Sequence, residues 1–221
     1  MAVTGRARFP IPDARPETPW ATQLLVRKSR FLAQTCHCRS REEGRAFLLR
    51  VQSLHPDATH NCWAFAAGAP GDRACVGYSD AGEPKGTAGA PMLNVLLHCG
   101  IGQICVVVSR WFGGIKLGAG GLARAYQNAV LLNLETLPVA QAVERISVRL
   151  GVDYAFLAAV QRLLPDFEAV IEESAYGELA GLVVSLPQDR RGEFDSALAT
   201  VTRGSATLLD LARETLSACG K

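Results

Sequence analysis

The spacing of apolar positions divides the first 140 residues into short alternating segments and longer segments with helix spacing. Apolar residues at every second position predict strands, and apolar residues three and four apart predict helices. In residues 60–67, for example, Cys62, Ala64 and Ala66 fall on one face of a strand. The pattern predicts strands over 20–26, 31–39, 60–67, 74–79 and 102–108, and helices over 41–54, 88–99 and 122–134.

Capping residues mark where two of these helices begin. Ser40 is a good N-cap, and Glu43 three residues later completes a capping box. The sequence His55-Pro56-Asp57 ends this first helix. Thr87 is the expected N-cap of the helix over 88–99.

From residue 143 onward the pattern is simpler, after a short linker over 138–141. It predicts strands over 143–152, 169–176, 179–186 and 206–211, and helices over 154–164 and 191–201. The order β-α-β-β-α-β is that of the ferredoxin-like fold. The chain is therefore predicted to be α+β, with a second domain over 143–221 in which no chemically active cluster is evident.

The N-terminal residues 1–19 contain four prolines and no apolar core of the kind that a signal peptide needs. We expect a flexible arm here, which leaves the first folded domain over 20–138. No apolar run reaches the eighteen or so residues that would span a bilayer. These observations predict a cytoplasmic protein with no membrane segment, whose seven cysteines are reduced and form no disulfides.

Charge is unevenly distributed between the two parts. Residues 1–140 hold 15 basic and 9 acidic side chains, a balance of +6, and residues 141–221 hold 8 and 12, a balance of −4. This asymmetry indicates two modules with different surfaces. A balance of +6 permits nucleic-acid binding without requiring it.

Five glycines lie within nine residues between the predicted strand at 102–108 and the helix at 122–134. A strand, a glycine loop and a helix start direct free N–H groups and a helix dipole at one point, which favours an anion. The segment matches neither of the two common nucleotide-binding fingerprints, and glycines also serve tight turns and close packing. The candidate anion or nucleic-acid site comprises Arg110, Gly113, Gly114, Lys116, Gly118, Gly120, Gly121, Arg124 and Tyr126.

A second glycine-rich segment, over 80–89, supplies candidates for acid–base chemistry. Glu83 beside a basic glycine loop could act as a base, and His60 and Asp80 are further candidate catalytic residues. Glu83 could equally pair with Arg110 or Lys116 and do no chemistry. Turn formation accounts for Asp80 without any catalytic role.

Cysteine and histidine spacing does not favour a metal centre. In a strand, Cys36 and Cys38 share a face and His37 points away, so the three cannot hold one ion. The sequence contains no C-x-x-C pair, which zinc sites commonly show. We therefore expect neither a metal nor another cofactor.

Several ordered segments resemble those of a bacterial member of the IMPACT (YigZ) family. The resemblance covers about residues 20–212 and rests on Lys28-Ser29-Arg30-Phe31, His55-Pro56-Asp57-Ala58, His60, Cys62, Gly77-Tyr78-Ser79-Asp80, Gly82-Glu83-Pro84, Gly86-Thr87-Ala88-Gly89, Pro91-Met92-Leu93 and the whole stretch 110–126.

The resemblance implies a first domain similar to the second domain of a small-subunit ribosomal protein, followed by a ferredoxin-like domain. It also implies a translation-related role, because eukaryotic relatives regulate translation through an additional N-terminal partner-binding domain. Nothing before residue 20 corresponds to that domain, so its partner is not carried over to this chain. Fold-level analogy alone does not assign an activity.

Three functional hypotheses follow. In the first, the protein binds RNA or the ribosome: phosphates meet the glycine loop, and Trp111 or Tyr126 stacks on a base. Core packing is the alternative role for these two aromatic residues. In the second, the protein is an enzyme acting on a nucleotide or a phosphorylated small molecule. In the third, the acidic second domain is a protein-interaction module with no catalytic activity.

Overall fold

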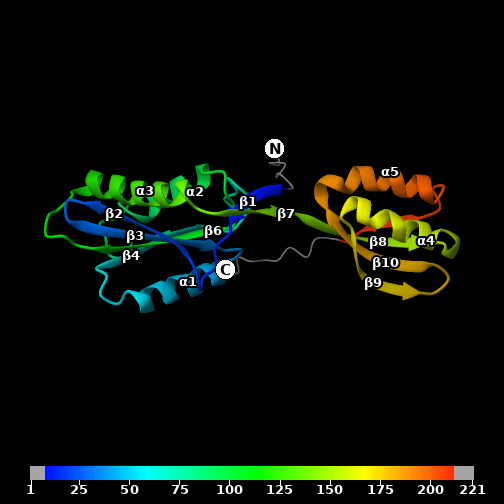
Figure 1. Cartoon of the computed structure of the whole chain (residues 1–221), viewed down its shortest axis with the longest axis horizontal. Coiled ribbons are helices and arrows are strands. Elements are labelled where there is room, and N and C mark those ends of the chain that lie inside the picture. Colours follow the sequence, from blue (N-terminus) through cyan, green and yellow to red (C-terminus); the bar gives the residue numbers. More distant parts are fainter. Residues whose placement is uncertain (1–7, 212–221) are drawn as a thin grey trace. The chain divides into compact units, whose positions relative to one another are not determined.

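The computed structural model describes residues 8–211, which form five α-helices and eleven strands in two compact units (Figure 1). The division falls between Ala142 and Val143. Both units combine antiparallel strands with helices, so the expected α+β class is confirmed. Each unit buries its own hydrophobic core.

Unit 1 is built on a five-stranded antiparallel sheet with the order β2-β3-β6-β4-β5. Helix α1 covers one face, and α2 and α3 cover the other (Figure 1). The strands are β2 (Trp20–Val26), β3 (Ser29–His37), β4 (His60–Ala66), β5 (Val76–Ser79) and β6 (Ile104–Trp111). The helices are α1 (Arg41–Leu54), α2 (Gly89–His98) and α3 (Ala119–Glu135).

Side chains along β4 point alternately into the two hydrophobic cores of this unit, as the sequence predicts. Cys62, Ala64 and Ala66 are buried beneath α2 and α3, whereas Phe65 packs with Phe47 of α1. The first helix also begins as expected, because the Ser40 hydroxyl accepts a hydrogen bond from the backbone N–H of Glu43 at 3.2 Å.

Residues 8–19 do not form the flexible arm that their prolines predict. Strand β1 (Arg8–Pro12) pairs with β7 (Val139–Val143), the segment expected to be a linker. Phe9 is 1% exposed, and the carbonyl of Pro10 accepts a hydrogen bond from the N–H of Gly102. Proline lacks an N–H group but is tolerated in an edge strand such as β1, where the outer N–H groups need no partner. Residues 1–7 lie outside the described part of the chain.

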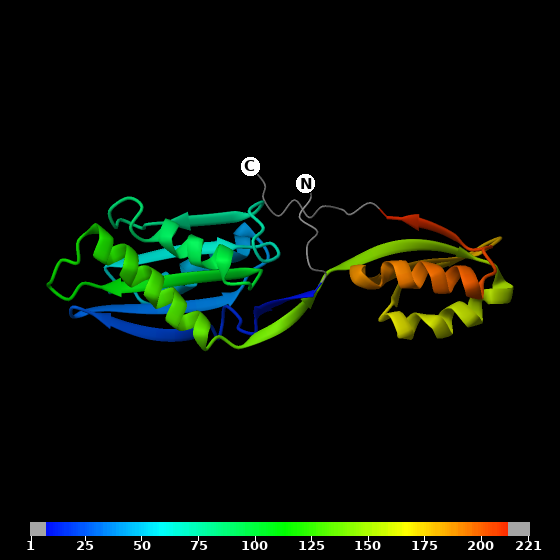
Figure 2. The same cartoon turned by 90° about the horizontal axis from the view of Figure 1, so that it is seen from above.

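Unit 2 has the ferredoxin-like topology predicted from the sequence. Its four-stranded antiparallel sheet has the order β11-β8-β10-β9, with α4 and α5 packed on one face (Figure 2). The elements are β8 (Arg145–Val152), α4 (Tyr154–Leu163), β9 (Val170–Tyr176), β10 (Ala180–Pro187), α5 (Arg191–Val201) and β11 (Thr207–Asp210), with short 3-10 turns at Leu164–Phe167 and Gln188–Arg190.

Two further expectations concern the membrane and the cysteines. Within residues 8–211, no helix combines the length and the apolar character that crossing a membrane demands. In the described part of the chain, the thiols of Cys36, Cys38, Cys62, Cys99 and Cys105 are free. Burial raises the pKa of the Cys62 thiol to about 12, so this residue stays protonated and acts as a small core side chain.

Candidate anion-binding pocket

Three side chains from neighbouring strands form a row on the α2/α3 face of the unit 1 sheet. The register pairs Arg110 at the centre with Phe31 of β3 on one side and His60 of β4 on the other. Arg110 is 5% exposed and Phe31 is fully buried. The row therefore places a guanidinium and an imidazole beside each other at the same end of the sheet.

Glu83 holds Arg110 in place. Nη1 of Arg110 donates a hydrogen bond to Oε1 of Glu83 at 2.6 Å, and the Tyr126 hydroxyl donates to the same oxygen at 2.8 Å. The side chains of the ion pair are 6% and 3% exposed. A buried ion pair needs such additional hydrogen bonds to offset the loss of hydration. Arg110 and Tyr126 are thus both held by Glu83, and Arg110 is not the mobile charge that the sequence suggests.

His60 presents its second ring nitrogen to the same carboxylate. Nδ1 lies 2.9 Å from the carbonyl oxygen of Ala81. A carbonyl can only accept, so the hydrogen-bond pattern assigns the proton to Nδ1. Nε2 then lies 3.9 Å from Oε2 of Glu83 and is an acceptor when the ring is neutral.

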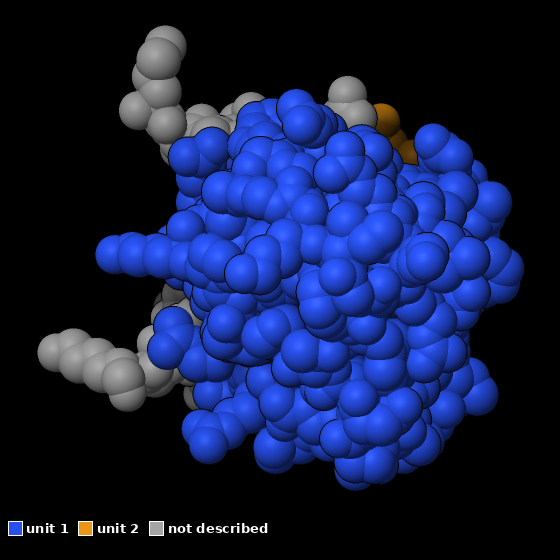
Figure 3. Space-filling model, turned by 90° about the vertical axis from the view of Figure 1, so that its left-hand side faces the viewer, with its two compact units in different colours: residues 1–142, 217–221 blue, residues 143–216 orange. Residues whose placement is uncertain are grey.

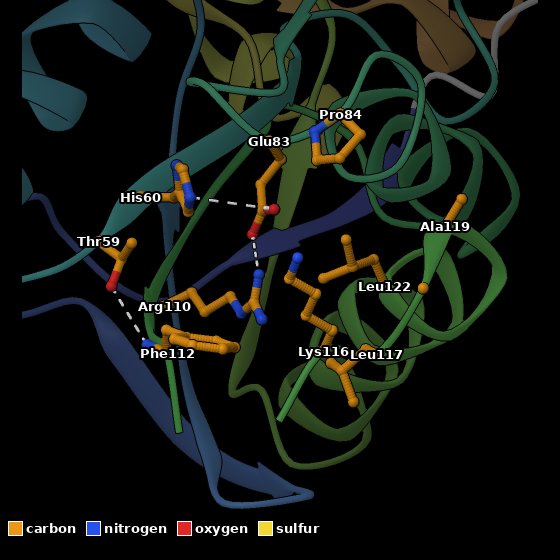
Figure 4. A pocket seen from close by; sticks show the side chains of 11 residues that line it. Thr59, His60, Glu83, Pro84, Arg110, Phe112, Lys116, Leu117, Ala119 and Leu122 are labelled. Carbon is orange, nitrogen blue, oxygen red and sulfur yellow. Dashed lines mark hydrogen bonds and ion pairs between the residues drawn. The ribbon is translucent and has the colours of Figure 1, made fainter. Parts of the chain in front are cut away.

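These residues line a pocket of about 420 Å³ (Figure 4). Lys116 extends into it beside Arg110 in this view, and the start of helix α3 forms the opposite wall. The lining residues are Thr59, His60, Glu83, Pro84, Arg110, Phe112, Lys116, Leu117, Gly118, Ala119 and Leu122.

The start of helix α3 offers N–H groups to this pocket. Its N-cap is Gly118, whose φ of +71° favours glycine, and no side chain of the described chain caps the helix. The uncapped N–H groups and the helix dipole make this end positive. In addition, Nε of Arg110 is buried and has no hydrogen-bond partner among the described residues. This nitrogen is shielded from solvent, so the positive character that the pocket presents comes from the start of α3 and from Lys116.

The glycines of the 110–126 stretch have separate roles. Gly113 is structural: its N–H donates to the hydroxyl of Ser29, and a Cβ there would lie 2.0 Å from the backbone carbon of Lys28. Gly114 has a φ of +84°. A Cβ at Gly120 would meet no atom within 4 Å, so neither packing nor φ requires glycine there. Of the five glycines of this stretch, Gly118 alone is part of the pocket lining.

Two of the residues predicted to contact RNA do not face the pocket. Arg124 is exposed on α3 and is absent from the pocket lining. Trp111 follows Arg110 in strand β6 and therefore points to the opposite face of the sheet. There Nε1 donates to Asp57 at 2.8 Å, and the Arg30 guanidinium lies 3.6 Å from the ring centroid.

The proposed stacking roles of Trp111 and Tyr126 are therefore wrong for this conformation, because the first ring is covered by Arg30 and the second is fully buried. The sequence reasoning missed Phe112, which is 48% exposed and lines the pocket. The alternation that turns Trp111 away from Arg110 returns Phe112 to the pocket face, and this signal was present in the sequence.

Asp80, a candidate catalytic residue, is occupied by the backbone. Its carboxylate accepts hydrogen bonds from the N–H groups of Gly86, Ala88 and Gly89 at 2.8–2.9 Å. Burial raises the pKa of the Asp80 carboxyl, but these three bonds outweigh burial and lower it below the ordinary value of 3.8. Asp80 rather than Thr87 caps helix α2; the Thr87 hydroxyl instead donates to the carbonyl of Pro84.

No three His, Cys, Asp or Glu side chains within residues 8–211 lie close enough together to hold a metal ion. Of the predicted catalytic candidates, the pocket brings His60 and Glu83 together and leaves Asp80 outside its lining.

Comparison with known proteins identifies the family. A model described as the Impact N-terminal domain matches residues 27–134, and one described as a domain of unknown function, DUF1949, matches residues 150–205. A protein of Escherichia coli (strain K12), described as IMPACT family member YigZ, is 40% identical over 194 residues, which cover 88% of this chain and 95% of that protein. The chain belongs to the IMPACT family.

Other IMPACT-family relatives agree with this assignment. An IMPACT family member of Haemophilus influenzae is 38% identical over 81% of this chain and 87% of its own length. A crystal structure described as that of a hypothetical protein is 39% identical, covers 94% of this chain and 98% of the other, and has a TM-score of 0.70. Every residue that lines the pocket falls within the Impact N-terminal domain.

Proposed function

We propose that this IMPACT-family protein acts in translation in the cytoplasm and binds a phosphate group of RNA, free or in the ribosome, in the pocket at the start of α3. The observation that carries the proposal is the uncapped N-terminus of α3, which opens on a pocket that also contains Arg110 and Lys116. The translational setting is the role that the family resemblance implies.

The charge balance of the pocket favours an anion. Glu83 is neutralised by Arg110, which leaves Lys116 and the helix terminus, equivalent to about half a positive charge. Because Lys116 is exposed and the pocket opens to solvent, a phosphate can enter while the rest of a polymer stays outside.

The proposal is tested by recovering nucleic acid with the tagged full chain from cell lysate at low and moderate salt, with and without nuclease. We expect nuclease-sensitive recovery of ribosomal RNA that falls steeply with salt and is lost in Lys116→Glu. Arg45→Glu is the matched control, because Arg45 is exposed on α1, which covers the opposite face of the sheet. Equal recovery by the wild type and Lys116→Glu, or no recovery by either, would contradict the proposal.

A second candidate function, an enzyme acting on a nucleotide or phosphorylated small molecule, is favoured by one observation. The hydrogen bond from Nδ1 of His60 to Ala81 leaves Nε2 as an acceptor beside Glu83, as a general base requires. Thermal stabilisation by phosphorylated metabolites, followed by their turnover and its loss in His60→Gln, would support this function. Stabilisation without turnover would show that the protein binds the metabolite but does not convert it.

A further inference from the structure

Phe112 is an aromatic side chain held at the rim of the pocket. Its ring is 48% exposed, whereas Phe31 and Tyr126 beneath the same pocket are fully buried. Its N–H donates to the Thr59 hydroxyl at 3.1 Å, which fixes the backbone. The Arg110 guanidinium lies 5.7 Å from the ring centroid. A large apolar ring, about half exposed, thus lies at the rim of the pocket.

The β2–β3 hairpin adjoins the loop that carries Phe112. A Cβ at Gly113 would collide with the backbone of Lys28, so loop and hairpin are in direct contact. Strand β2 turns into β3 through Arg27 and Lys28 alone, since Val26 pairs with Ser29. Both turn residues have positive φ, 44° and 66°, and both are exposed.

This turn has an unfavourable sequence for its geometry. Two-residue turns with positive φ at both positions favour Asn-Gly, because other side chains are strained in the left-handed region. Arg and Lys at these positions are therefore not explained by turn formation. Their shared property is positive charge presented at the most protruding part of the hairpin.

The hairpin turn and the pocket loop form one surface, which we call the tip surface: residues 25–28 and 112–118. Both segments lie at the same end of unit 1 in Figures 1 and 2, and Figure 3 views the molecule from this end. The tip surface contains no acidic residue. Its exposed side chains are the basic Arg27, Lys28 and Lys116 and the apolar Leu25, Phe112 and Ile115.

We propose that the tip surface binds single-stranded RNA, with one base stacked on Phe112, its phosphate at the start of α3 beside Lys116, and neighbouring phosphates on Arg27 and Lys28. A base can lie on an aromatic ring only when it is unstacked from its neighbours, which excludes a continuous duplex. This inference rests on the proposed function, because the phosphate site is the same.

An anionic membrane is the other partner that exposed apolar and basic side chains suit. RNA fits better, because a nucleotide has both an aromatic base for Phe112 and a phosphate for the recessed site lined by Arg110. A bilayer surface would contact the exposed side chains but offers no aromatic ring to stack on Phe112.

The test measures binding of the full chain to a fluorescent single-stranded RNA of about eight nucleotides and to a duplex of the same length. We expect preference for the single strand. Phe112→Leu, which keeps an apolar side chain but removes the ring, should weaken binding by about fivefold or more, whereas Phe112→Trp should preserve it. Folding of each variant is checked by its thermal unfolding.

A second variant, Arg27→Asn with Lys28→Gly, separates charge from folding. It gives the turn its preferred sequence, so the unfolding temperature should rise while RNA affinity falls and the dependence of affinity on salt becomes weaker. The double change Arg41→Glu with Arg45→Glu alters charge on α1 instead and should leave affinity unchanged.

The outcomes separate this inference from the proposed function. If Lys116→Glu abolishes RNA binding but Phe112→Leu and the turn variant do not weaken it, the phosphate site stands and the tip-surface inference is wrong. Equal affinity for duplex and single strand also overturns the inference. If the chain binds no RNA, both fail. Binding to phosphatidylserine vesicles that depends on Phe112, without RNA binding, would identify a membrane surface.

Discussion

The two glycine-rich segments of unit 1, residues 80–89 and 113–121, both connect a strand to the start of a helix, yet their polar groups are used differently. In the first, the carboxylate of Asp80 accepts hydrogen bonds from three backbone N–H groups around the start of α2. In the second, no described side chain caps α3, and the helix start lines a pocket.

The difference shows that glycine content alone does not distinguish a structural loop from a binding loop. The first segment contains its own anion, and the second contains no acidic residue. A helix start that lacks an internal acceptor is left for water or an external ligand. The ion pair joins Glu83 of the first segment to Arg110 of strand β6, which leads into the second segment.

Removing Arg110 should have the largest effect on this arrangement. Arg110→Ala leaves the carboxylate of Glu83 buried without its cation, and breaking a buried pair in this way costs about 3–5 kcal/mol. Urea denaturation measures the loss in free energy of unfolding. The double variant Arg110→Met with Glu83→Gln removes both charges and should recover part of it. A loss below about 1 kcal/mol in Arg110→Ala would mean that water replaces the guanidinium.

Gly113 tests whether the second glycine-rich segment, residues 113–121, also has a structural role. Gly113→Ala places a Cβ 2.0 Å from the backbone of Lys28, where no flexible side chain can move aside. Overpacking of this kind costs up to about 3 kcal/mol. Thermal unfolding should show a clear decrease. An unchanged midpoint would show that the loop and the hairpin separate easily in solution.

Asp80 tests the first glycine-rich segment, residues 80–89. Asp80→Ala removes the acceptor for three N–H groups and should destabilise the protein by about 2 kcal/mol, the upper range for loss of an N-cap. RNA affinity measured on the folded fraction should not change, because Asp80 does not line the pocket. If Asp80 had a catalytic or binding role, Asp80→Ala would instead lose activity while its free energy of unfolding stayed unchanged.

The lowered pKa of Asp80 predicts a pH dependence of stability. The hydrogen bonds to Asp80 favour the charged carboxylate in the folded state. The stability that they add is therefore present above pH 3.8, the ordinary pKa of the group, and is lost as the pH falls from that value through the lower pKa of the folded state. The wild type and Asp80→Asn should therefore converge in free energy of unfolding in strong acid. A constant difference across this range would show that Asp80 titrates normally.

Gly120 should show the smallest effect on stability and a distinct effect on binding. Because a Cβ at this position meets no atom, Gly120→Ala should stabilise the protein by up to about 1 kcal/mol. Under the proposed function a phosphate approaches the first turn of α3, to which Gly120 belongs, so the added methyl group should also weaken RNA binding although Gly120 itself does not line the pocket.

Gly192 provides a matched control for this prediction. It is the second residue of α5, as Gly120 is of α3, and a Cβ there also meets no atom within 4 Å. Gly192→Ala should stabilise the protein similarly and leave binding unchanged. If Gly120→Ala binds RNA as tightly as Gly192→Ala does, the phosphate does not approach the start of α3.

Most of the fold could be predicted because periodicity records which face of each element is buried. Strand β4 and helix α1 show this clearly, and helix α5 begins and ends at the predicted residues. Strand β1 could not be predicted in this way. Its prolines indicate irregular structure locally, and its partner β7 lies about 130 residues away in the sequence.

The candidate site was predicted in part. Charge and glycine content identified the segment with Lys116 and Gly118, and the search for acid–base side chains beside it suggested Glu83 and His60. Which groups are already satisfied depends on tertiary contacts: the choice of Arg110 rather than Lys116 as the partner of Glu83, and the contact of Gly113 with Lys28. Local sequence cannot report these contacts, because each joins residues from different elements.

The pairing of β1 with β7 also bears on how the chain folds during its synthesis. β1 is among the first described residues to leave the ribosome, but its hydrogen-bonding partner follows only after α3 has been made. The edge of β1 that pairs with β7 must therefore remain uncovered while most of unit 1 is translated. Completion of the first unit is consequently tied to the emergence of residue 143, the residue at which the second unit begins.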